Sequence, residues 1–250
     1  MTEPLLGVAS DNAGRTETIA PNAEPDFSAL CTKVNARIAA FLDAAPATER
    51  LRSVQEQTRL SLRILEEALE RYSALHTHTQ KTSTKLPHSL QSVYIVSPHP
   101  FHQVEEFVAE SVSTYHLDLA RYAKPMRQAF EEYLHDKEEV KAIFVGTRRT
   151  DPHGASLKYF DPTDRGWPPF MRIHPVIDWH YAEIWTFIRH LDIPYCSLYD
   201  LGYTSLGGTT DTHPNPALRA QSDKDKAADT GYRPAYELVE DEEERLGRDK

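Results

Sequence analysis

The spacing of apolar residues divides the first part of the chain into an irregular start and two amphipathic stretches. Residues 1–26 show neither a helical nor a strand period and are rich in small, polar and proline residues, which predicts a disordered segment. Two helices are predicted next, over 27–42 and 48–72, with a break at Pro46. Their apolar stripes are Phe27, Leu30, Val34, Ile38 and Phe41 in the first helix, and Leu51, Val54, Leu62, Leu65, Leu69 and Tyr72 in the second.

Strand-like and helical patterns alternate in the following part of the chain. A rhythm of strand, helix and strand is typical of a parallel sheet with crossover helices, so the chain is predicted to have an α/β fold. The predicted strands span 92–96, 142–145 and 170–174; the predicted helices carry Val104 to Tyr115, span 126–134, and follow Asp178 as an N-cap with Ile184, Phe187, Ile188 and Leu191 on one side.

The chain length and composition fit one main domain with loosely attached terminal segments, because 250 residues with 40% apolar content support a single sizeable core. The formal net charge of -10 argues against nucleic-acid partners, since binding them requires a basic excess. Two cysteines, Cys31 and Cys196, make neither a disulfide framework nor a thiolate zinc site. With no signal-like start and no apolar run of membrane length, we expect a cytoplasmic monomer without a membrane partner.

The most suggestive polar residues follow the strand predicted over 142–145. Gly146 leads into Arg148, Arg149 and Asp151, at the carboxyl end of a strand, where ligands of open parallel sheets bind. Arginines bind phosphates bidentately, and a nearby carboxylate can hold the divalent metal that such phosphates require. The same residues also fit a solvated turn, so residue types alone leave both interpretations open.

Four separated motifs then point to one family. They read GTRRTDP, TDRGWPPFMRIHPVIDW, YTSLGGTTDTHPNPALR and YRPAYELVEDEEERLGR. In this order they resemble eukaryotic-type FAD synthases, the FMN adenylyltransferases of the PAPS reductase-like superfamily. The resemblance implies a Rossmann-like parallel sheet with flanking helices, as in adenine nucleotide alpha hydrolases, over residues 74–219. A helical part over 27–73 would precede this domain, and a flavin- and phosphate-contacting tail over 220–250 would follow it.

The implied activity is that of a nucleotidyltransferase with FMN and ATP as small-molecule partners. AMP passes from ATP, which carries Mg²⁺, to FMN and gives FAD and pyrophosphate. By resemblance, Asp151 and Arg245 are catalytic, and Asp151 is also the candidate magnesium ligand. FMN-binding roles fall on Asp164, Trp167, Arg172 and Arg248. The nucleotide-side loop residues implied by the resemblance are Gly146, Arg148, Arg149, Gly207, Gly208 and Asn215.

Physical reasons support several of these roles, although each residue also has a structural explanation. An aromatic wall such as Trp167 suits a flat isoalloxazine ring, and a guanidinium suits a terminal phosphate. Taken singly, Trp167 also fits a residue that fills a gap in the core, and Arg172 fits a residue that faces solvent. The pair Gly207 and Gly208 also fits ordinary loop geometry. Only the ordered set of motifs favours the functional interpretation.

One structural feature of the superfamily, its glycine-rich phosphate loop, is missing from this chain. ATP pyrophosphate is held there by a glycine-rich loop, Ser-x-Asn-Gly-Gly-Lys-Asp, between the first strand and a helix, where backbone amides approach the phosphates. No glycine occurs between Gly14 and Gly146, and Ser73 runs directly into Ala74, where the resemblance places this segment. The simplest hypothesis is that a strand and its loop are missing at this junction, through a missing exon, a splice variant or an error in the gene model. Their loss would uncover neighbouring strand edges and would impair the use of ATP.

Two alternatives remain beside an impaired FAD synthase. One is a non-catalytic flavin-binding paralogue, which keeps the flavin segment without the nucleotide loop. The other is a PAPS reductase-like thiol enzyme, which needs a nucleophilic cysteine near the carboxyl terminus. The absence of any cysteine after Cys196 disfavours the thiol enzyme.

Overall fold

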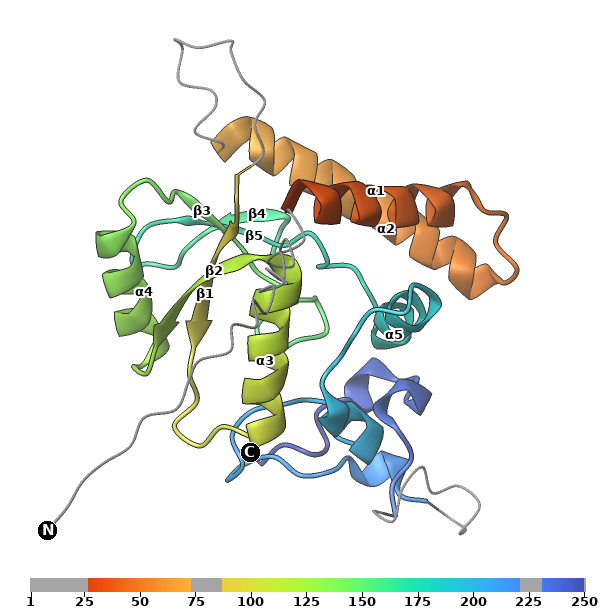
Figure 1. The fold of residues 1–250 in the computed structure, drawn as a ribbon. Helices are drawn as coiled ribbons and strands as arrows, with labels where there is room; N and C mark the ends of the chain where they lie inside the picture. The colour runs from red at the N-terminus through yellow and green to blue at the C-terminus, as the bar shows by residue number, and fades with distance from the viewer. Residues whose placement is uncertain (1–26, 73–86, 221–230, 250) are drawn as a thin grey trace, which may run out of the picture.

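The computed structural model describes residues 27–72, 87–220 and 231–249, which form helices around two small sheets (Figure 1). The segment 1–26 and the Ser73–Ala74 junction lie outside the described residues. The helices are α1 (Phe27–Asp43), α2 (Glu49–Tyr72), α3 (His102–Tyr115), α4 (Met126–Asp136) and α5 (Tyr181–His190), and the strands are β1 (Leu90–Ile95), β2 (Leu117–Tyr122), β3 (Ala142–Phe144), β4 (Phe160–Pro162) and β5 (Met171–Ile173). Short 3-10 helices follow at Ser197–Leu201, Pro216–Leu218, Ala235–Glu237 and Asp241–Glu243.

The two amino-terminal helices form as the apolar stripes predict, and they pack together across the top of the view in Figure 1. Phe41 of α1 and Val54 of α2 are buried together with Trp179 from the second half of the chain. The Gln55 side chain donates to the carbonyl oxygen of Phe41 at 2.7 Å and so satisfies a buried polar group. Helix α2 also packs against α5, so these helices are part of the main fold.

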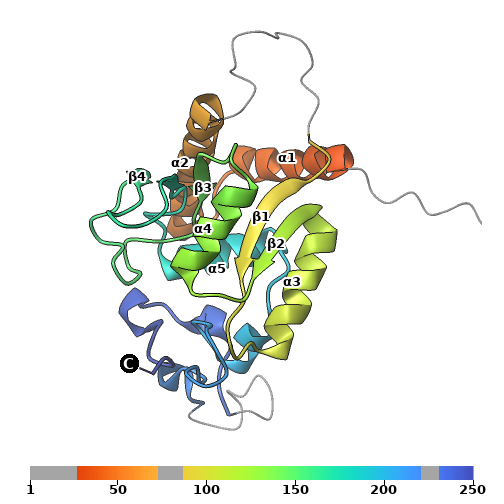
Figure 2. The ribbon, with the colours of Figure 1, turned by 90° about the vertical axis from the view of Figure 1, so that its left-hand side faces the viewer.

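Strands β1 and β2 form a parallel pair joined by α3. Their register runs from Leu90 opposite Leu117 to Ile95 opposite Tyr122. Helices α3 and α4 lie on opposite sides of this pair in both ribbon views (Figures 1 and 2). The sequence patterns predicted β1, α3 and α4 but not β2. This strand begins directly after His116, whose left-handed backbone (φ 51°) ends α3.

The second sheet has the order β3, β5, β4. Strands β3 and β5 are parallel, with Ile143 opposite Arg172, in keeping with the parallel sheet that the sequence patterns predicted. Strand β4 is antiparallel to β5 and was not predicted. It has three residues and ends in Pro162, so it offers little periodicity to detect. The fold is thus an α/β arrangement of parallel strands and flanking helices, with one antiparallel strand at its edge.

The two sheets are separate within the described residues. β1 pairs only with β2, and β3 pairs only with β5, so each keeps one edge without a strand partner in the part of the chain that the structure describes. A continuous parallel sheet would place these edges beside a common neighbour. The Ser73–Ala74 junction lies outside the described residues, so the loss of a strand there stays a prediction.

The largest buried cluster among the described residues surrounds α5 and the residues that follow it. Tyr181 and Trp185 of this helix are buried with Leu218, Ala235 and Leu238. A second cluster joins α2 to the β3–β5–β4 sheet through Ile64, Ala68 and Ile173. Across residues 27–72, 87–220 and 231–249, no helix is long and apolar enough to cross a membrane.

One expected helix boundary is wrong. Asp178 does not cap α5, which begins three residues later at Tyr181. Two other carboxylates take over this role. Glu183 accepts from the backbone amide of His180 at 2.9 Å, and Asp241 accepts from that of Tyr181 at 2.7 Å. Asp178 is held elsewhere by ion pairing to Arg149.

Candidate active site

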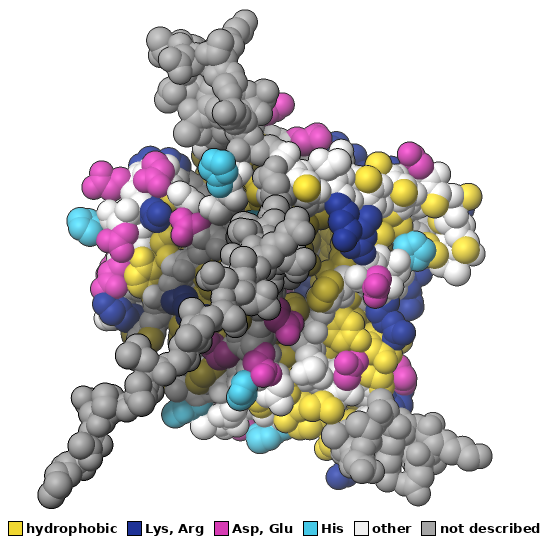
Figure 3. Space-filling model, viewed as in Figure 1, with side chains coloured by type: hydrophobic (Ala, Val, Ile, Leu, Met, Phe, Trp, Pro, Cys, Tyr) yellow, Lys and Arg dark blue, Asp and Glu magenta, His cyan; other side chains and the backbone are white. Residues whose placement is uncertain are grey.

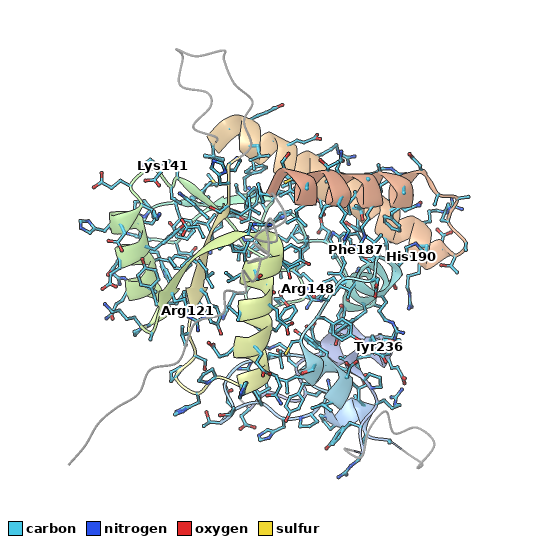
Figure 4. The ribbon with its side chains drawn as sticks, viewed as in Figure 1. Arg121, Lys141, Arg148, Phe187, His190 and Tyr236 are labelled. Atoms are coloured by element: carbon cyan, nitrogen blue, oxygen red, sulfur yellow. The ribbon has the colours of Figure 1, made fainter. Side chains whose placement is uncertain are left out.

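A cavity of about 580 Å³ opens at the carboxyl end of β3. We call it the first cavity. The loop 146–152, helix α5, residues 204–206 and the pair Glu244 and Arg245 contribute to its lining. Arg148 lies near the centre of the molecule, between α3 and the carboxyl-terminal segment, where Figure 4 labels it. This is the position at which an open parallel sheet presents its ligand site.

The loop after β3 is held in one conformation by Asp151. Its carboxylate accepts from the backbone amide of Arg148 at 2.8 Å and from the Arg148 guanidinium at 2.9 Å. The loop closes with a hydrogen bond from the amide of Gly154 to the carbonyl oxygen of Asp151 at 2.9 Å. A Cβ atom at Gly154 would collide with the carbonyl oxygen of Arg148, so only glycine fits there. The sequence motif thus positions the first arginine rigidly.

Arg148 is buried and shared by three carboxylates. Besides Asp151, its guanidinium pairs with Glu244 and lies 3.8 Å from Asp241. Burial opposes the charge of Arg148, but Glu244 and Asp151 outweigh it and raise the pKa of Arg148. Burial raises the pKa of Glu244 in spite of Arg148, and the nearby charges of Asp151 and Asp241 act in the same direction. The cluster therefore contains more acid than a single guanidinium can neutralise.

Aromatic side chains form the opposite wall of the first cavity. Trp185 contacts the rings of Tyr195 and Tyr199 edge-on, with both centroid distances at 5.1 Å. Burial raises the pKa of Tyr199 to about 12, and it raises that of Tyr181 still further, so both phenols are neutral. The hydroxyl of Tyr181 is buried without a hydrogen-bond partner. Sequence reasoning missed this wall, although Tyr181 and Trp185 stand four residues apart on a predicted helix.

Asn215 and Thr204 tie the carboxyl-terminal tail onto the first cavity. The amide of fully buried Asn215 donates to Thr204 at 2.8 Å and to the carbonyl oxygen of Glu243 at 2.7 Å. Thr204 in turn donates to the carbonyl oxygen of Glu244 at 2.6 Å. Asn215 therefore has a structural role: it holds the backbone of residues 243–244, and this fixes the position of Arg245, which follows Glu244. The guanidinium of Arg245 is exposed and reaches Ser205 at 3.3 Å on the rim of the cavity.

Arg248 forms a separate group with the glycine pair. Its guanidinium pairs with Asp211 at 2.8 Å, and a Cβ atom on Gly207 would collide with that guanidinium. The amide of Gly208 donates to the same carboxylate at 2.9 Å. Gly207 is thus needed for the close approach of Arg248. None of these residues lines the first cavity, although the tail places Arg245 and Arg248 three residues apart.

Three of the four residues predicted to bind the flavin, Asp164, Trp167 and Arg172, lie on the β4–β5 hairpin, whereas the fourth, Arg248, lies beside Asp211. Asp164 pairs with Arg172 at 3.3 Å, and the ring of Trp167 is 38% exposed, which leaves a face available to a ligand. Their loop precedes β5, whereas Asp151 follows β3, and the two strands are parallel. The hairpin loop and the first cavity therefore stand at opposite ends of neighbouring strands, and no hairpin residue lines the cavity.

Arg149 also points away from the first cavity. Its guanidinium pairs with Asp178 and donates to the carbonyl oxygen of Leu157 at 2.7 Å. Asp178 accepts a second hydrogen bond from Tyr159 at 2.5 Å. Of the residues predicted from the sequence, Gly146, Arg148, Asp151 and Arg245 line the first cavity.

Comparison with known proteins identifies the family. Residues 75–214 match the model of the phosphoadenosine phosphosulfate reductase domain. The probable FAD synthase of Schizosaccharomyces pombe is 37% identical over 231 residues, which cover 83% of this chain and 84% of that protein. The chain belongs to the FAD synthase family.

Two further comparisons agree with this family. The flavin adenine dinucleotide synthase of Saccharomyces cerevisiae is 37% identical over 139 residues, which are 53% of this chain and 45% of that protein. The crystal structure of Candida glabrata FMN adenylyltransferase with FMN and an ATP analogue is 26% identical. It has a TM-score of 0.74 and covers 90% of this chain and 99% of that one. The Rossmann-like, PAPS reductase-like fold inferred from the motifs is confirmed.

The thiol chemistry of PAPS reductases has no support in this member of the family. Cys196 is buried, and its sulfur lies 3.6 Å from the carbonyl oxygen of Gln103. Burial raises the pKa of the Cys196 thiol, which disfavours the nucleophilic thiolate. The sequence contains no cysteine after this one.

A resident magnesium ion does not fit the arrangement of the described residues. They include no group of three His, Cys, Asp or Glu side chains that could hold a metal. Both carboxylate oxygens of Asp151 already accept hydrogen bonds from Arg148. Asp151 is therefore engaged with a cation of the protein itself, and magnesium ligation by Asp151 stays a prediction.

Proposed function

We propose that this protein is an FMN adenylyltransferase, which transfers AMP from ATP to FMN and releases FAD and pyrophosphate. One observation carries the proposal. In a chain of the FAD synthase family, Arg148, Asp151 and Arg245 converge on one cavity at the carboxyl end of β3. Charged phosphates need a cation such as Arg245, since phosphoryl and nucleotidyl transfer depend on positioning and neutralisation of charge.

The proposed reaction needs little from the protein beyond orientation and charge. A phosphate oxygen of FMN attacks the α-phosphorus of ATP, and the bond to the β-phosphate breaks. Arg245 is exposed on the rim, and among the residues that the structure describes its side chain donates a hydrogen bond to Ser205 alone, so it can turn toward a phosphate. Arg148 is fixed and its charge is already shared, so its role is to hold Asp151 and the tail in place.

Magnesium belongs to this proposal as the counter-ion that arrives with ATP. Its binding would rest mainly on the phosphates, in keeping with the preference of Mg²⁺ for phosphate oxygens and water. We further propose that the protein works as a cytoplasmic monomer. Size-exclusion chromatography with light scattering tests the oligomeric state; a stable dimer would contradict it.

We also propose that this chain binds FMN more readily than it turns over ATP. The sequence between Gly14 and Gly146 has no glycine with which to build a phosphate loop. The test compares this chain with a variant that carries a Ser-x-Asn-Gly-Gly-Lys-Asp strand–loop–helix segment between Ser73 and Ala74. FAD formation from FMN, ATP and Mg²⁺ should rise strongly in the variant, while FMN affinity measured by calorimetry stays similar.

The outcomes separate the two parts of the proposal. Equal turnover with and without the inserted segment would show that the missing loop is irrelevant. Absence of FMN binding in both proteins would overturn the assignment of function. FMN binding without turnover in either protein would favour the second candidate, a non-catalytic flavin-binding paralogue, which the missing glycines support.

A further inference from the structure

A second cavity, of about 450 Å³, lies beside α5 and is lined by basic and aromatic side chains. Arg50 comes from the start of α2, Arg189 and His190 come from the last turn of α5, and Tyr236 comes from the carboxyl-terminal segment. Figure 4 labels His190 and Tyr236 on the same side of the molecule. Trp185 lines this cavity and the first one. The two cavities thus share Trp185 in their linings.

The charge of the second cavity is unusual for a protein with a net charge of -10. No acidic residue lines it, and within the described ranges neither Arg50 nor Arg189 has a carboxylate partner within salt-bridge distance. Arg148 in the first cavity, by contrast, has three. In Figure 3, Lys and Arg side chains gather on the right of the view, where Figure 1 shows α1 and α5.

Helix electrostatics explain only part of this arrangement. Arg189 and His190 suit the negative carboxyl end of α5. Arg50, however, stands in the first turn of α2, where a cation is disfavoured because the helix start is itself positive. That helix start also lines the cavity through Thr48 and Leu51. A neighbouring cavity contains Glu49, Glu240 and Glu242 and also borders on Arg50, yet none of these carboxylates pairs with it.

Arg189 is held in place before any ligand arrives. Its guanidinium carbon lies 3.8 Å from the centroid of the Tyr236 ring, a stacked geometry that leaves the planar N–H groups at its edge available. A guanidinium fixed in this way loses less side-chain entropy when it binds a phosphate. The volume of the cavity lies within the range of pockets that take small ligands.

We propose that the second cavity is a binding site for a phosphate-bearing small molecule, separate from the first cavity. Arg50, Arg189 and the positive start of α2 would bind the phosphate groups, and Tyr236 and Trp185 would contact the rest of the ligand. The site is independent of the proposed catalytic function, since none of its three basic residues lines the first cavity.

Calorimetric titration of the full chain with inorganic pyrophosphate tests this site. The key variant is the double substitution Arg50→Ala with Arg189→Ala; both side chains are exposed, so the fold should be kept. Arg63→Ala is the matched control, since Arg63 is exposed on the same helix and lies outside the lining of the second cavity. Arg245→Ala reports on the first cavity. Unfolding curves check that every variant is folded.

We expect the double variant to lose one class of pyrophosphate site, with affinity at least about tenfold weaker, and the Arg63 control to keep it. Equal stoichiometry and affinity in the double variant and the control would overturn the proposal. Failure of the catalytic proposal gives a different result. In that case Arg245→Ala would change nothing, while the double variant would still lose its site.

Discussion

The unit β1–α3–β2 and the segment from β5 to Leu238 contain similar elements but differ in burial. Residues 87–128 are all described, and none of them is buried. The later segment contains Ile173, Ile177, Leu198 and Leu218, each at most 2% exposed. Both regions have the alternating apolar pattern of an α/β protein. The difference shows that pattern alone does not produce a core, because a second layer must cover the apolar face.

Besides the β1–β2 ladder, the less buried unit has exposed ion pairs. Glu105 accepts from Tyr94 at 2.9 Å and pairs with Arg121, and Lys137 lies 3.7 Å from Asp118. Such pairs contribute only about 0–1 kcal/mol each at a protein surface. The later segment relies instead on buried side chains, which contribute roughly 1.5–3 kcal/mol each. We expect the two regions to respond differently to the same substitution.

The largest effect should come from Leu218→Ala. Its side chain is fully buried in the cluster around Trp185, so its removal should lower the free energy of unfolding by about 2–5 kcal/mol. Leu119→Ala in β2 is the matched substitution; Leu119 is only partly buried and its loss should cost about 1 kcal/mol. Urea unfolding of both variants measures the difference. Equal losses would show that the β1–α3–β2 unit is packed as tightly as the later segment.

The second effect concerns the hydrogen bonds of Asn215, which join the tail to the first cavity. Asn215→Ala removes four hydrogen bonds and leaves the hydroxyl of Thr204 and the carbonyl oxygen of Glu243 short of a partner. The expected loss is roughly 1–3 kcal/mol, the usual cost of unsatisfied buried polar groups. Faster proteolysis within 240–249 should accompany it. An unchanged cleavage rate would mean that Asp241 and Glu244 hold the tail without Asn215.

The sequence predicted the elements with long periodic patterns and failed on the short ones. Helix α2 has an apolar stripe over six turns and its bounds are nearly as predicted, whereas β2 and β4 have six and three residues and follow or precede sharp turns. The Asp178 cap was wrong because Glu183 and Asp241 accept from the helix start instead, and Asp241 is 60 residues away from Tyr181. No local pattern encodes such a contact.

In the candidate site, too, residues that are close in the sequence were predicted, and residues that meet only through tertiary packing were not. Gly146, Arg148 and Asp151 were expected together because the end of a strand places them together, and Arg245 joins them through the tail. The aromatic wall around Trp185 was missed because Tyr195 and Tyr199 reach it only through tertiary packing. Whether Trp167 contributes to flavin binding depends on the distance between the hairpin and the cavity, and sequence does not contain that information.

The third prediction tests whether FMN binds at the β4–β5 hairpin or at the rim of the first cavity. Trp167→Ala removes an exposed indole from the hairpin, and stacking of an isoalloxazine ring on it predicts an approximately tenfold weaker affinity, or about 1.4 kcal/mol. Arg245→Ala should weaken FMN binding by a similar factor if the phosphate lies at the cavity rim. Calorimetry with riboflavin as well as FMN separates them, because the riboflavin affinity should depend on Trp167 and not on Arg245. Unchanged affinity for Trp167→Ala would move the ring to the wall around Trp185.

The smallest effect is a pH dependence of tail docking through His180 and Asp241. The hydrogen bond and charge of Asp241 raise the pKa of His180 above its ordinary value of 6.5, although burial and Arg148 oppose them and Glu183 assists them. Since the pKa is raised in the folded state, the stabilisation is complete below pH 6.5 and is lost as pH rises through the folded value. The imidazole is largely exposed, so solvent screens much of the effect.

The His180→Gln variant isolates this contribution from the other titrating groups. Stability to urea should fall between pH 6 and pH 8 in the unmodified chain and fall less in the variant. His135→Gln is the control, since His135 is exposed on α4, far along the chain from the tail. An equal fall in all three proteins would show that His180 does not carry this pH dependence.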